Sequence, residues 1–375
     1  MKNVLITGGA GFIGSNLAKR LHADGWHVTI LDTLSPQIHT ADPENSALFQ
    51  SIKSISKFIH GDVTDRPALT AALAGQDAVV HYAAETGTGQ SMYEIERYNR
   101  VNVGGTALLL DIMANKPHQV RRLVVASSRS IYGEGKYLYG NEAVYPGTRS
   151  DEDMQAGRFE PRMAGHGPLT LAATDEESRI HPSSVYGITK QVQEQLVLAV
   201  CPTIGVEGVA LRYQNVYGPG QSLTNPYTGI LSIFSNLIMS GKPINVFEDG
   251  LESRDFVLID DVVEATALAL TAPAAAGKAV NVGTGVPVDV LTVVQTLQRV
   301  LGRNVPVTVS GNYRLGDIRH NFACMKRAAD VLGFVPRHDF ESGMAKFCAW
   351  ALEQGPQASG YERSIDELRE KGLLK

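Results

Sequence analysis

The chain has 375 residues, of which 43% are hydrophobic and 19% are charged, a composition that allows a well-buried core and excludes disordered, collagen-like and coiled-coil proteins. The formal net charge of −5 offers no basic surface for phosphates, so the expected partner is a small molecule and not nucleic acid. Cys201, Cys324 and Cys348 form no CxxC pair, which argues against a disulfide framework or a thiolate zinc site and fits a reducing cytoplasm. Because no apolar stretch reaches the length of a signal peptide or a membrane span, no membrane partner is expected.

Short runs of valine, isoleucine and leucine alternate along the chain with segments of helical periodicity. The runs predict strands at residues 4–7, 27–31, 58–60, 78–81, 123–126, 206–211 and 279–282. The segments between them predict helices at residues 12–24, 66–73, 101–115, 184–200 and 260–270, with two more at 288–301 and 339–354. Apolar strands separated by helices indicate an α/β fold, in which helices cover both faces of a doubly wound parallel sheet.

A glycine-rich turn follows the first predicted strand. Gly8, Gly11 and Gly14 lie between that strand and the next predicted helix. Here the first glycine allows a tight turn, the second lets a pyrophosphate approach the helix N-terminus, and the third lets helix and strand pack closely. The next strand leads to Asp32, where a carboxylate binds the adenosine ribose hydroxyls and repels a ribose phosphate. The pattern predicts a Rossmann domain that binds NAD in preference to NADP.

Residues after the third and fourth strands are expected to line the same cofactor. Asp62 and Val63 could reach the adenine, and Ala83 and Ala84 would line the cofactor edge. For Asp62 a helix cap ahead of Thr64 is nearly as good an interpretation.

Tyr186 and Lys190 lie four residues apart in a predicted helix and therefore share one face. A fixed ammonium group favours phenolate and would lower the tyrosine pKa toward neutrality, which makes Tyr186 a candidate base for an alcohol or sugar hydroxyl. A YxxxK pair alone is common by chance. The strand at 123–126, however, leads to Ser128 at the sheet edge where ligands bind, so this hydroxyl could hydrogen-bond the reacting oxygen.

Taken together, the motifs resemble those of the extended short-chain dehydrogenases/reductases, in particular the NAD-dependent nucleotide-sugar epimerases and dehydratases. The matching segments are 7–14 (TGGAGFIG), 62–63, 81–84 (HYAA), 102–106 (NVGGT), 127–133 (SSRSIYG), 186–190 (YGITK), 211–220 (LRYQNVYGPG), 254–263 (RDFVLIDDVV), 281–285 (NVGTG) and 316–320 (GDIRH). The resemblance implies that Ser128, Tyr186 and Lys190 are catalytic, that Lys190 also binds ribose, and that the substrate is a nucleotide-diphosphate sugar.

The resemblance also implies the remaining ligand contacts. Tyr186 and Lys190 would touch the cofactor together with Phe12, Ile13, Tyr213 and Val216. The expected substrate-binding residues are Glu85, Ser128, Arg129, Asn215, Arg254 and Arg319; of these, Asn215, Arg254 and Arg319 would hold the diphosphate, a role that suits the planar guanidinium fork of arginine. Gln214 and Cys324 depart from the family pattern, which leaves the base contacts open. No metal site is expected. We expect a homodimer that forms through helices 101–115 and 184–200.

Members of this family begin by oxidising the sugar and differ in the step after that oxidation. Dehydratases and decarboxylases carry an acid directly after the catalytic hydroxyl, whereas Arg129 and Ser130 follow Ser128 here. Epimerases that act beside the keto carbon need a further acid/base pair, often with cysteine, and no cysteine lies near a motif. This leaves 4-epimerisation, favoured by Asp32, or reduction of a 4-keto sugar, for which NADPH is usual. A non-catalytic NAD-binding regulator is an alternative of another class, against which the intact Ser128, Tyr186 and Lys190 argue.

Residues 133–181 break the alternation of strands and helices and are too long for an ordinary connection. We expect an ordered lid near the site, because long loops in compact domains are usually functional. Its stretches at 144–153 and 157–162 are similar to those of family members that convert dTDP-L-rhamnose to dTDP-6-deoxy-L-talose; UDP-hexose 4-epimerases are the nearest alternative, and a solvated charged loop is the other interpretation of the segment. We expect residues 1–212 to form the NAD-binding domain, to which 255–285 return, and residues 213–254 and 286–375 to form a smaller, mostly C-terminal α/β region for the nucleotide sugar.

Overall fold

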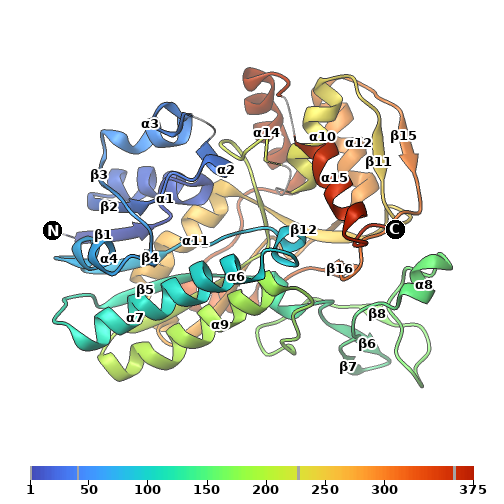
Figure 1. Ribbon diagram of the computed structural model, residues 1–375. Helices are drawn as coiled ribbons and strands as arrows, with labels where there is room; N and C mark the ends of the chain where they lie inside the picture. The colour runs from blue at the N-terminus through green and yellow to red at the C-terminus, as the bar shows by residue number, and fades with distance from the viewer. Residues whose placement is uncertain (1, 40–41, 226–228, 358–359) are drawn as a thin grey trace.

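The computed structural model describes residues 2–39, 42–225, 229–357 and 360–375. Its main element is a seven-stranded sheet in the order β13-β9-β5-β4-β1-β2-β3, in which every neighbouring pair is parallel (Figure 1). The strands are β1 (Lys2–Thr7), β2 (Trp26–Asp32), β3 (Ser56–His60), β4 (Ala78–His81), β5 (Arg122–Ser128), β9 (Glu207–Tyr213) and β13 (Lys278–Val282). The prediction of a doubly wound parallel sheet from these seven runs is confirmed.

Helices cover both faces of this sheet, because successive strand residues point to opposite sides. In β1, Val4 and Ile6 belong to one apolar core, whereas Leu5 between them belongs to the other. The first core packs against α1 (Phe12–Ala23) and α11 (Ile259–Thr271). The second packs against α4 (Arg66–Leu73), α7 (Gly105–Asn115) and α9 (Val185–Val200).

The remaining elements of this half lie around the sheet. They are α2 (Pro36–His39), α3 (Ala47–Lys53), α5 (Thr88–Ser91), α6 (Ile95–Tyr98) and the π-helical turn η2 (Asn99–Gly104). The last two join α7 without a break, so the helix predicted from residue 101 begins earlier, at Ile95.

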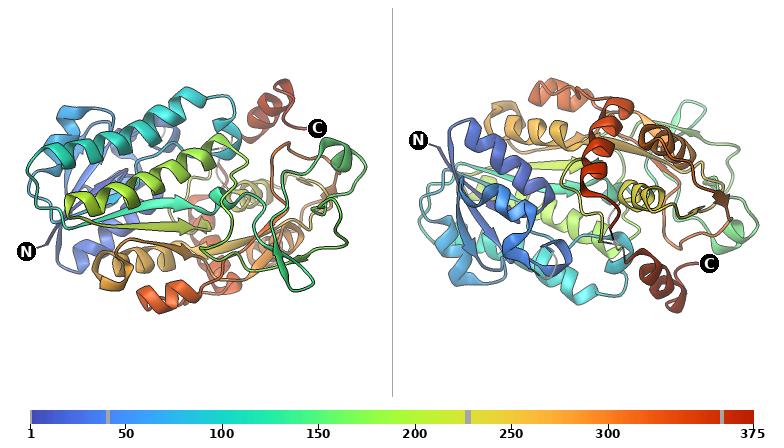
Figure 2. Two further views of the ribbon diagram at one scale, coloured as in Figure 1. Left: turned by 90° about the horizontal axis from the view of Figure 1, so that it is seen from below. Right: turned by 90° about the horizontal axis from the view of Figure 1, so that it is seen from above.

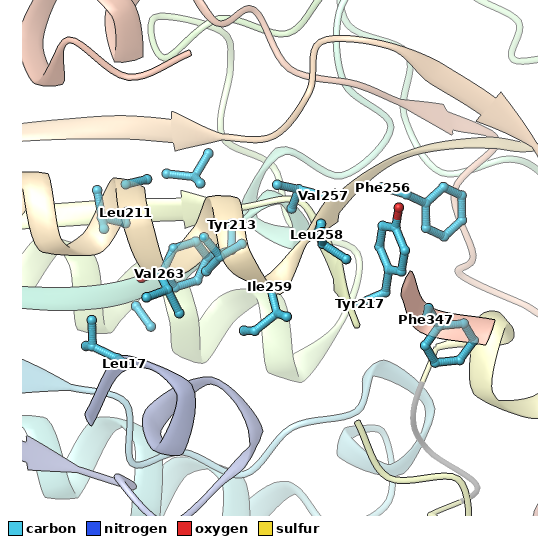
Figure 3. Close-up of a cluster of buried hydrophobic side chains, with 14 of the residues drawn as sticks. Leu17, Leu211, Tyr213, Tyr217, Phe256, Val257, Leu258, Ile259, Val263 and Phe347 are labelled. Carbon is cyan, nitrogen blue, oxygen red and sulfur yellow. The ribbon is translucent and has the colours of Figure 1, made fainter. Parts of the chain in front are cut away.

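The second half of the molecule is built on a smaller sheet of β10 (Asn215–Tyr217), β12 (Ser253–Leu258), β14 (Pro287–Asp289) and β16 (His320–Asn321). Beside it lie a two-stranded sheet, β11 (Ile244–Val246) with β15 (Val307–Val309), and the helices α10 (Ile230–Met239), α12 (Val290–Leu301), α13 (Lys326–Leu332), α14 (Phe340–Gln354) and α15 (Tyr361–Glu370). The first apolar core continues into this half, from Leu17 and Leu211 to Phe256 and Phe347 (Figure 3). We propose that the large-sheet half binds NAD and the second half the nucleotide sugar.

The segment 133–181 is ordered. It forms a three-stranded antiparallel sheet of β6 (Tyr137–Tyr139), β7 (Glu142–Val144) and β8 (Thr170–Leu171), with the short helix α8 (Asp151–Gln155). These elements extend below β16, on the side of the second half (Figure 1). Within the described parts of the chain, no helix has the length and apolar character needed to cross a membrane.

Candidate active site

A cavity of about 760 Å³ opens where the strands of the large sheet end. This is the edge at which parallel α/β sheets bind their ligands. All residues predicted to touch the cofactor line it: Gly8, Gly11, Phe12, Ile13, Gly14, Asp32, Asp62, Val63, Ala83, Ala84, Tyr186, Lys190, Tyr213 and Val216. Glu85 and Ser128, predicted to bind the substrate, line it as well.

The glycine-rich turn is shaped for a close ligand. Gly8 has φ +67°, and a Cβ there would lie 2.7 Å from the amide nitrogen of Ala83. A Cβ on Gly14 would lie 2.5 Å from the carbonyl oxygen of Gly8, so helix α1 and the turn could not pack as they do. A Cβ on Gly11 would meet only that same carbonyl, at 3.4 Å, because this glycine faces the cavity. No side chain caps the N-terminus of α1, so its N–H groups are available to a pyrophosphate.

Acidic side chains stand at the ends of β2 and β3. The Asp32 carboxylate accepts hydrogen bonds from the N–H groups of Ala10 (3.0 Å) and Leu34 (2.8 Å), which fix it beside the glycine turn. Each oxygen keeps a further lone pair for ribose hydroxyls. Asp62 accepts from both the N–H and the hydroxyl of Thr64, at 2.8 Å each, so it organises a turn and lines the cavity at once. These residues fit NAD.

The side chains of Ser128, Tyr186 and Lys190 converge beside this cavity. Ser128 ends β5, and its Oγ accepts hydrogen bonds from the N–H and the hydroxyl of Ser130, at 3.1 and 2.9 Å. The Tyr186 side chain is hydrogen-bonded to that of Ser128. One turn along α9, Lys190 Nζ lies 5.9 Å from the Tyr186 ring centroid and donates to the Ala126 carbonyl at 3.0 Å. The structure thus brings the three predicted catalytic residues together.

Burial dominates the electrostatics of this group. Burial raises the pKa of Tyr186, and the hydrogen bond with Ser128 and the charge of Arg129 offset only part of the rise. Burial also lowers the pKa of Lys190 to about 7, because the low-dielectric surroundings disfavour its charge. The prediction that Lys190 would bring the Tyr186 pKa toward neutrality is therefore wrong when the protein is considered without its cofactor.

The segment between β4 and α6, residues 85–93, contributes Glu85 and Thr86 to the lining of the cavity; we call it the wall loop. The side chain of Asn102 holds its first residue, since Oδ1 accepts from the Glu85 N–H (2.7 Å) and Nδ2 donates to the Glu85 carbonyl (3.1 Å). The same Nδ2 donates to Thr189 on α9, at 3.0 Å. The Ser91 hydroxyl accepts from the Tyr186 N–H at 3.0 Å. Two buried side chains thus tie the wall loop to the catalytic helix.

Sequence analysis assigned no role to Asn102 or Ser91. Tyr98 was also overlooked, although its hydroxyl donates to the carbonyls of Thr86 (2.7 Å) and Gly87 (3.1 Å) and shapes the same loop. The presence of Asn102 in the NVGGT motif was the one available signal. Glu85 itself is paired with Arg97 through Oε2 at 2.7 Å.

Arg129, Asn215 and Arg254, predicted to bind the substrate, do not line this cavity. They belong to a cluster with other arginines in which Arg129 lies close enough to Tyr186 to lower the pKa of that tyrosine. Arg129 Nε donates to Asn215 Oδ1 at 2.7 Å, and Arg254 donates to Asp317 Oδ1 at 3.2 Å. Burial and the nearby charge of Arg254 lower the pKa of Arg129 to about 10. Although burial opposes it, the charges of Arg254, Arg314, Arg149 and Arg129 keep the pKa of Asp317 below its usual value. A carboxylate shared by so many guanidinium groups leaves positive charge available to an anion.

Arg314 is a member of this cluster that sequence analysis did not identify. Its Nε is buried without a hydrogen-bond partner among the described residues, and its guanidinium carbon lies 5.2 Å from the Phe247 ring centroid. A buried, unpaired donor is costly to leave unsatisfied, so this arginine is poised for a ligand. The RLGD sequence at 314–317 places it two residues before the recognised GDIRH motif.

The structure does not bring Arg319 to the cavity, contrary to the prediction that it holds the diphosphate. Its side chain is 1% exposed. The guanidinium donates to Asp249 at 2.7 and 2.9 Å, to Glu160 at 2.9 Å and to Glu248 at 3.1 Å. These carboxylates neutralise its charge, and one of them, Glu160, comes from the segment 133–181. Arg319 therefore joins that segment to the second half.

The segment 133–181 is likewise not a lid over the large cavity, since none of its described residues lines it. Buried ion pairs hold the segment against the second half instead. Arg149 donates to both oxygens of Glu248, at 2.7 and 2.8 Å, and the Glu134 carboxylate accepts from the N–H groups of Arg319 and His320. The expectation of order is confirmed. The segment does not cover the large cavity, but it lies near the arginine cluster, where Arg149 Nη2 donates to the Asp317 carbonyl at 3.0 Å.

The Rossmann sheet, its glycine turn and the Ser128, Tyr186 and Lys190 group define a dinucleotide-dependent enzyme of the short-chain dehydrogenase/reductase type. A family model described as the NAD dependent epimerase/dehydratase family matches residues 4–283. The chain belongs to this family. It is an NAD-dependent nucleotide-sugar epimerase, as the motifs predicted.

Named relatives resemble nearly the whole chain. A dTDP-L-rhamnose 4-epimerase of Burkholderia thailandensis is 37% identical over 94% of this chain and 96% of its own length. A UDP-glucose 4-epimerase of Mycolicibacterium smegmatis is 31% identical over 91% of this chain and 96% of its own. Among solved structures, MoeE5 in complex with UDP-glucuronic acid and NAD is 28% identical, with a TM-score of 0.74 over 94% of this chain and 99% of that one.

Proposed function

We propose that the protein interconverts dTDP-L-rhamnose and dTDP-6-deoxy-L-talose by oxidising carbon 4 of the sugar and returning the hydride to its opposite face. The observation that carries the proposal is a catalytic group flanked by a cation. Ser128, Tyr186 and Lys190 can serve oxidation and reduction at one carbon, while the next residue, Arg129, pairs with Asn215 and offers no carboxylate for elimination of water. The choice of sugar is supported by the 37% identity with a dTDP-L-rhamnose 4-epimerase.

The chain's own residues would handle the proton and the orientation of the sugar. Tyr186 takes the proton of the 4-hydroxyl group while Ser128 hydrogen-bonds the same oxygen, and the proton returns when the new 4-hydroxyl forms. NAD, when bound, supplies a reversible hydride acceptor whose positive charge favours the tyrosinate. Lys190 lies on the cavity side of the same helix turn, where its ammonium can bind ribose hydroxyls.

The arginine cluster would anchor the diphosphate while the sugar turns. Arg129, Arg254 and Arg314 offer guanidinium groups suited to phosphate oxygens, and Asn215 holds Arg129 in place. An anchor remote from the reacting carbon allows the keto sugar to rotate without leaving the site. Arg319 is not part of this anchor.

The test is an NMR assay of the purified enzyme with dTDP-L-rhamnose in deuterated water, without added NAD. The proposal expects a second set of sugar signals for the carbon-4 epimer, with hydrogen retained at carbon 4, because it travels as hydride. Deuterium at carbon 3 or 5 would indicate enolisation and contradict the mechanism. UDP-glucose run in parallel tests the alternative substrate, and absence of turnover on any dTDP-, UDP-, GDP- or CDP-sugar would favour a regulator.

We further propose a homodimer through α7 and α9. Ile188 on α9 is a large apolar side chain that is 47% exposed, as expected of a helix that meets a partner. Light scattering coupled to size exclusion tests this, and a monomeric mass at micromolar concentration would contradict it.

A further inference from the structure

The C-terminal strap, residues 360–375, spans the two halves of the molecule. It consists of Gly360, α15 and the five residues that follow it. In both views of Figure 2 this helix, dark red, lies beside the chain around α5 and α6, and its Glu362 pairs with Lys242 of the second half at 2.9 Å. None of the motifs or the proposed catalytic steps uses it.

At one end the strap packs on the wall loop. The Tyr93 hydroxyl donates to Glu367 Oε2 at 3.2 Å, and Lys371 Nζ lies 4.8 Å from the Tyr93 ring centroid. Leu368 is 8% exposed, and a Cβ on Gly89 would lie 3.6 Å from its Cδ2. The strap therefore presses on the loop that carries Glu85 and binds the catalytic helix through Ser91.

At the other end the strap pairs with the backbone on both sides of Arg314. Leu373 accepts from the Leu315 N–H at 3.0 Å, and Tyr313 and Lys375 exchange N–H to carbonyl bonds of 2.9 and 3.0 Å. Asp151 joins them from the segment 133–181, since its carboxylate accepts from Tyr313 Oη and Lys375 Nζ, at 2.6 Å each. Arg314, with its unpaired buried Nε, is thus held on a backbone that the strap completes.

We propose that the strap is a substrate-positioning element, which holds Arg314 toward the nucleoside diphosphate and the wall loop toward the sugar. This rests on the proposed function only for the class of substrate, a nucleotide sugar. The strap can also open at low cost, because its helix is largely polar and only Ser364, Leu368 and Leu374 of its residues are buried. None of the strap's described residues lines the large cavity, so the strap acts on the site through Arg314 and the wall loop.

The test compares the intact, NAD-loaded enzyme with a chain that ends at Gln357, by titration calorimetry with dTDP and with UDP. Loss of one positioned arginine contact should weaken the affinity of the preferred nucleotide about tenfold. The bound NAD should stay unchanged. In the intact enzyme, hydrogen exchange of α15 should slow when dTDP is added, a change that a purely structural tail would not show.

A point variant keeps the test valid if the shortened chain does not fold. Leu368→Ala loosens the strap on Gly89, and Leu352→Ala, at a leucine that is 54% exposed on α14, removes the same atoms elsewhere. Only Leu368→Ala should raise KM for the sugar nucleotide, by about threefold with kcat little changed. Equal nucleotide affinity in the intact and shortened chains, or equal KM in the two leucine variants, would overturn the proposal.

The two proposals can fail separately. If the intact enzyme does not convert dTDP-L-rhamnose but strap removal still weakens UDP binding, the strap stands and the choice of substrate falls. If the enzyme epimerises dTDP-L-rhamnose and strap removal changes neither affinity nor hydrogen exchange, the choice of substrate stands and the strap proposal falls.

Discussion

The two ends of the active site are assembled in different ways. At the cofactor end, the lining residues lie at strand ends, as Gly8 follows β1 and Asp32 ends β2. The Asp32 carboxylate accepts from backbone N–H groups, those of Leu34 and of Ala10 in the glycine-rich turn. At the proposed substrate end, polar side chains from distant segments meet, as Arg129 meets Asn215 and Arg254 meets Asp317. A local motif therefore suffices to predict the first kind of site, whereas the second depends on which of several arginines finds a carboxylate.

The largest expected effect separates cofactor binding from turnover. Tyr186→Phe removes the proton acceptor but keeps the ring, so turnover should fall by about 10²–10⁴-fold while NAD stays bound. Rates on the nucleotide sugar and the NAD content of the purified variant check this. Tyr139→Phe, at a tyrosine that is 42% exposed, serves as the matched control. A near-normal rate in Tyr186→Phe would remove that residue from the mechanism.

The second prediction separates Arg319, which the motif suggested as a diphosphate ligand, from Arg314, which the motif did not suggest. Arg319→Met leaves a cluster of carboxylates without its cation and should lower the free energy of unfolding by about 3–5 kcal/mol. Arg314→Met should change stability little and raise KM for the nucleotide sugar about tenfold or more, because its Nε has no protein partner to lose. Urea unfolding and initial rates measure the two effects. The opposite pattern would restore Arg319 as the diphosphate ligand.

The third prediction concerns selectivity at the cofactor end. Asp32→Ala removes a carboxylate that would repel a 2′-phosphate, so the preference for NAD over NADP should narrow by about tenfold, the size of one hydrogen bond to a charged group. Competition binding with the two nucleotides measures it. Tight NADP binding by the unaltered protein would contradict the role of Asp32.

The smallest effect concerns the ion pairs of Arg319 and depends on pH. Hydrogen bonds with His320 and Arg319 lower the pKa of Glu160 to about 2. Since the folded pKa is depressed, the stabilisation is complete above the unfolded pKa and is lost as the pH falls toward 2. The side chain is 64% exposed, so solvent screening limits the contribution to below about 1 kcal/mol.

Glu160→Gln should therefore destabilise the protein slightly at pH 7 and by a smaller amount at pH 3, where the unfolded carboxyl is already protonated while the folded one is not. Denaturant unfolding at the two pH values measures this difference. Glu152→Gln, at an exposed glutamate of α8, is the control. A pH-independent difference between Glu160→Gln and the unaltered protein would show that the ion pair contributes nothing.

Much of the fold followed from periodicity, since parallel strands buried on both faces must be apolar throughout. All seven such runs became neighbours in one sheet. The helix α10 was not predicted, although Leu231, Phe234 and Ile238 recur at helical spacing. The short strands of the second half, such as β16 with two residues, carry too little pattern to predict.

Prediction of the site from the sequence is limited for similar physical reasons. Ser128, Tyr186 and Lys190 come together because strand ends and one helix face fix them. Burial reverses the expected pKa of Tyr186, and burial depends on packing that no spacing reveals. The position of residues 133–181 depends on buried ion pairs such as Arg149 with Glu248, whose partners are 99 residues apart.

The π-helical turn at Asn99–Gly104 supports two parts of the site at once, the wall loop and the helix that carries Tyr186. Wide turns of this kind displace one residue from the regular helical spacing. Here the turn carries Asn102, whose single carboxamide holds both the sugar-facing wall and the helix of the catalytic base. A substitution that moves this amide to admit a different sugar would also move the helix of Tyr186, and so would alter the rate of hydride transfer. New specificity in this enzyme is therefore easier to reach by altering side chains that the wall displays than by altering the wall's support.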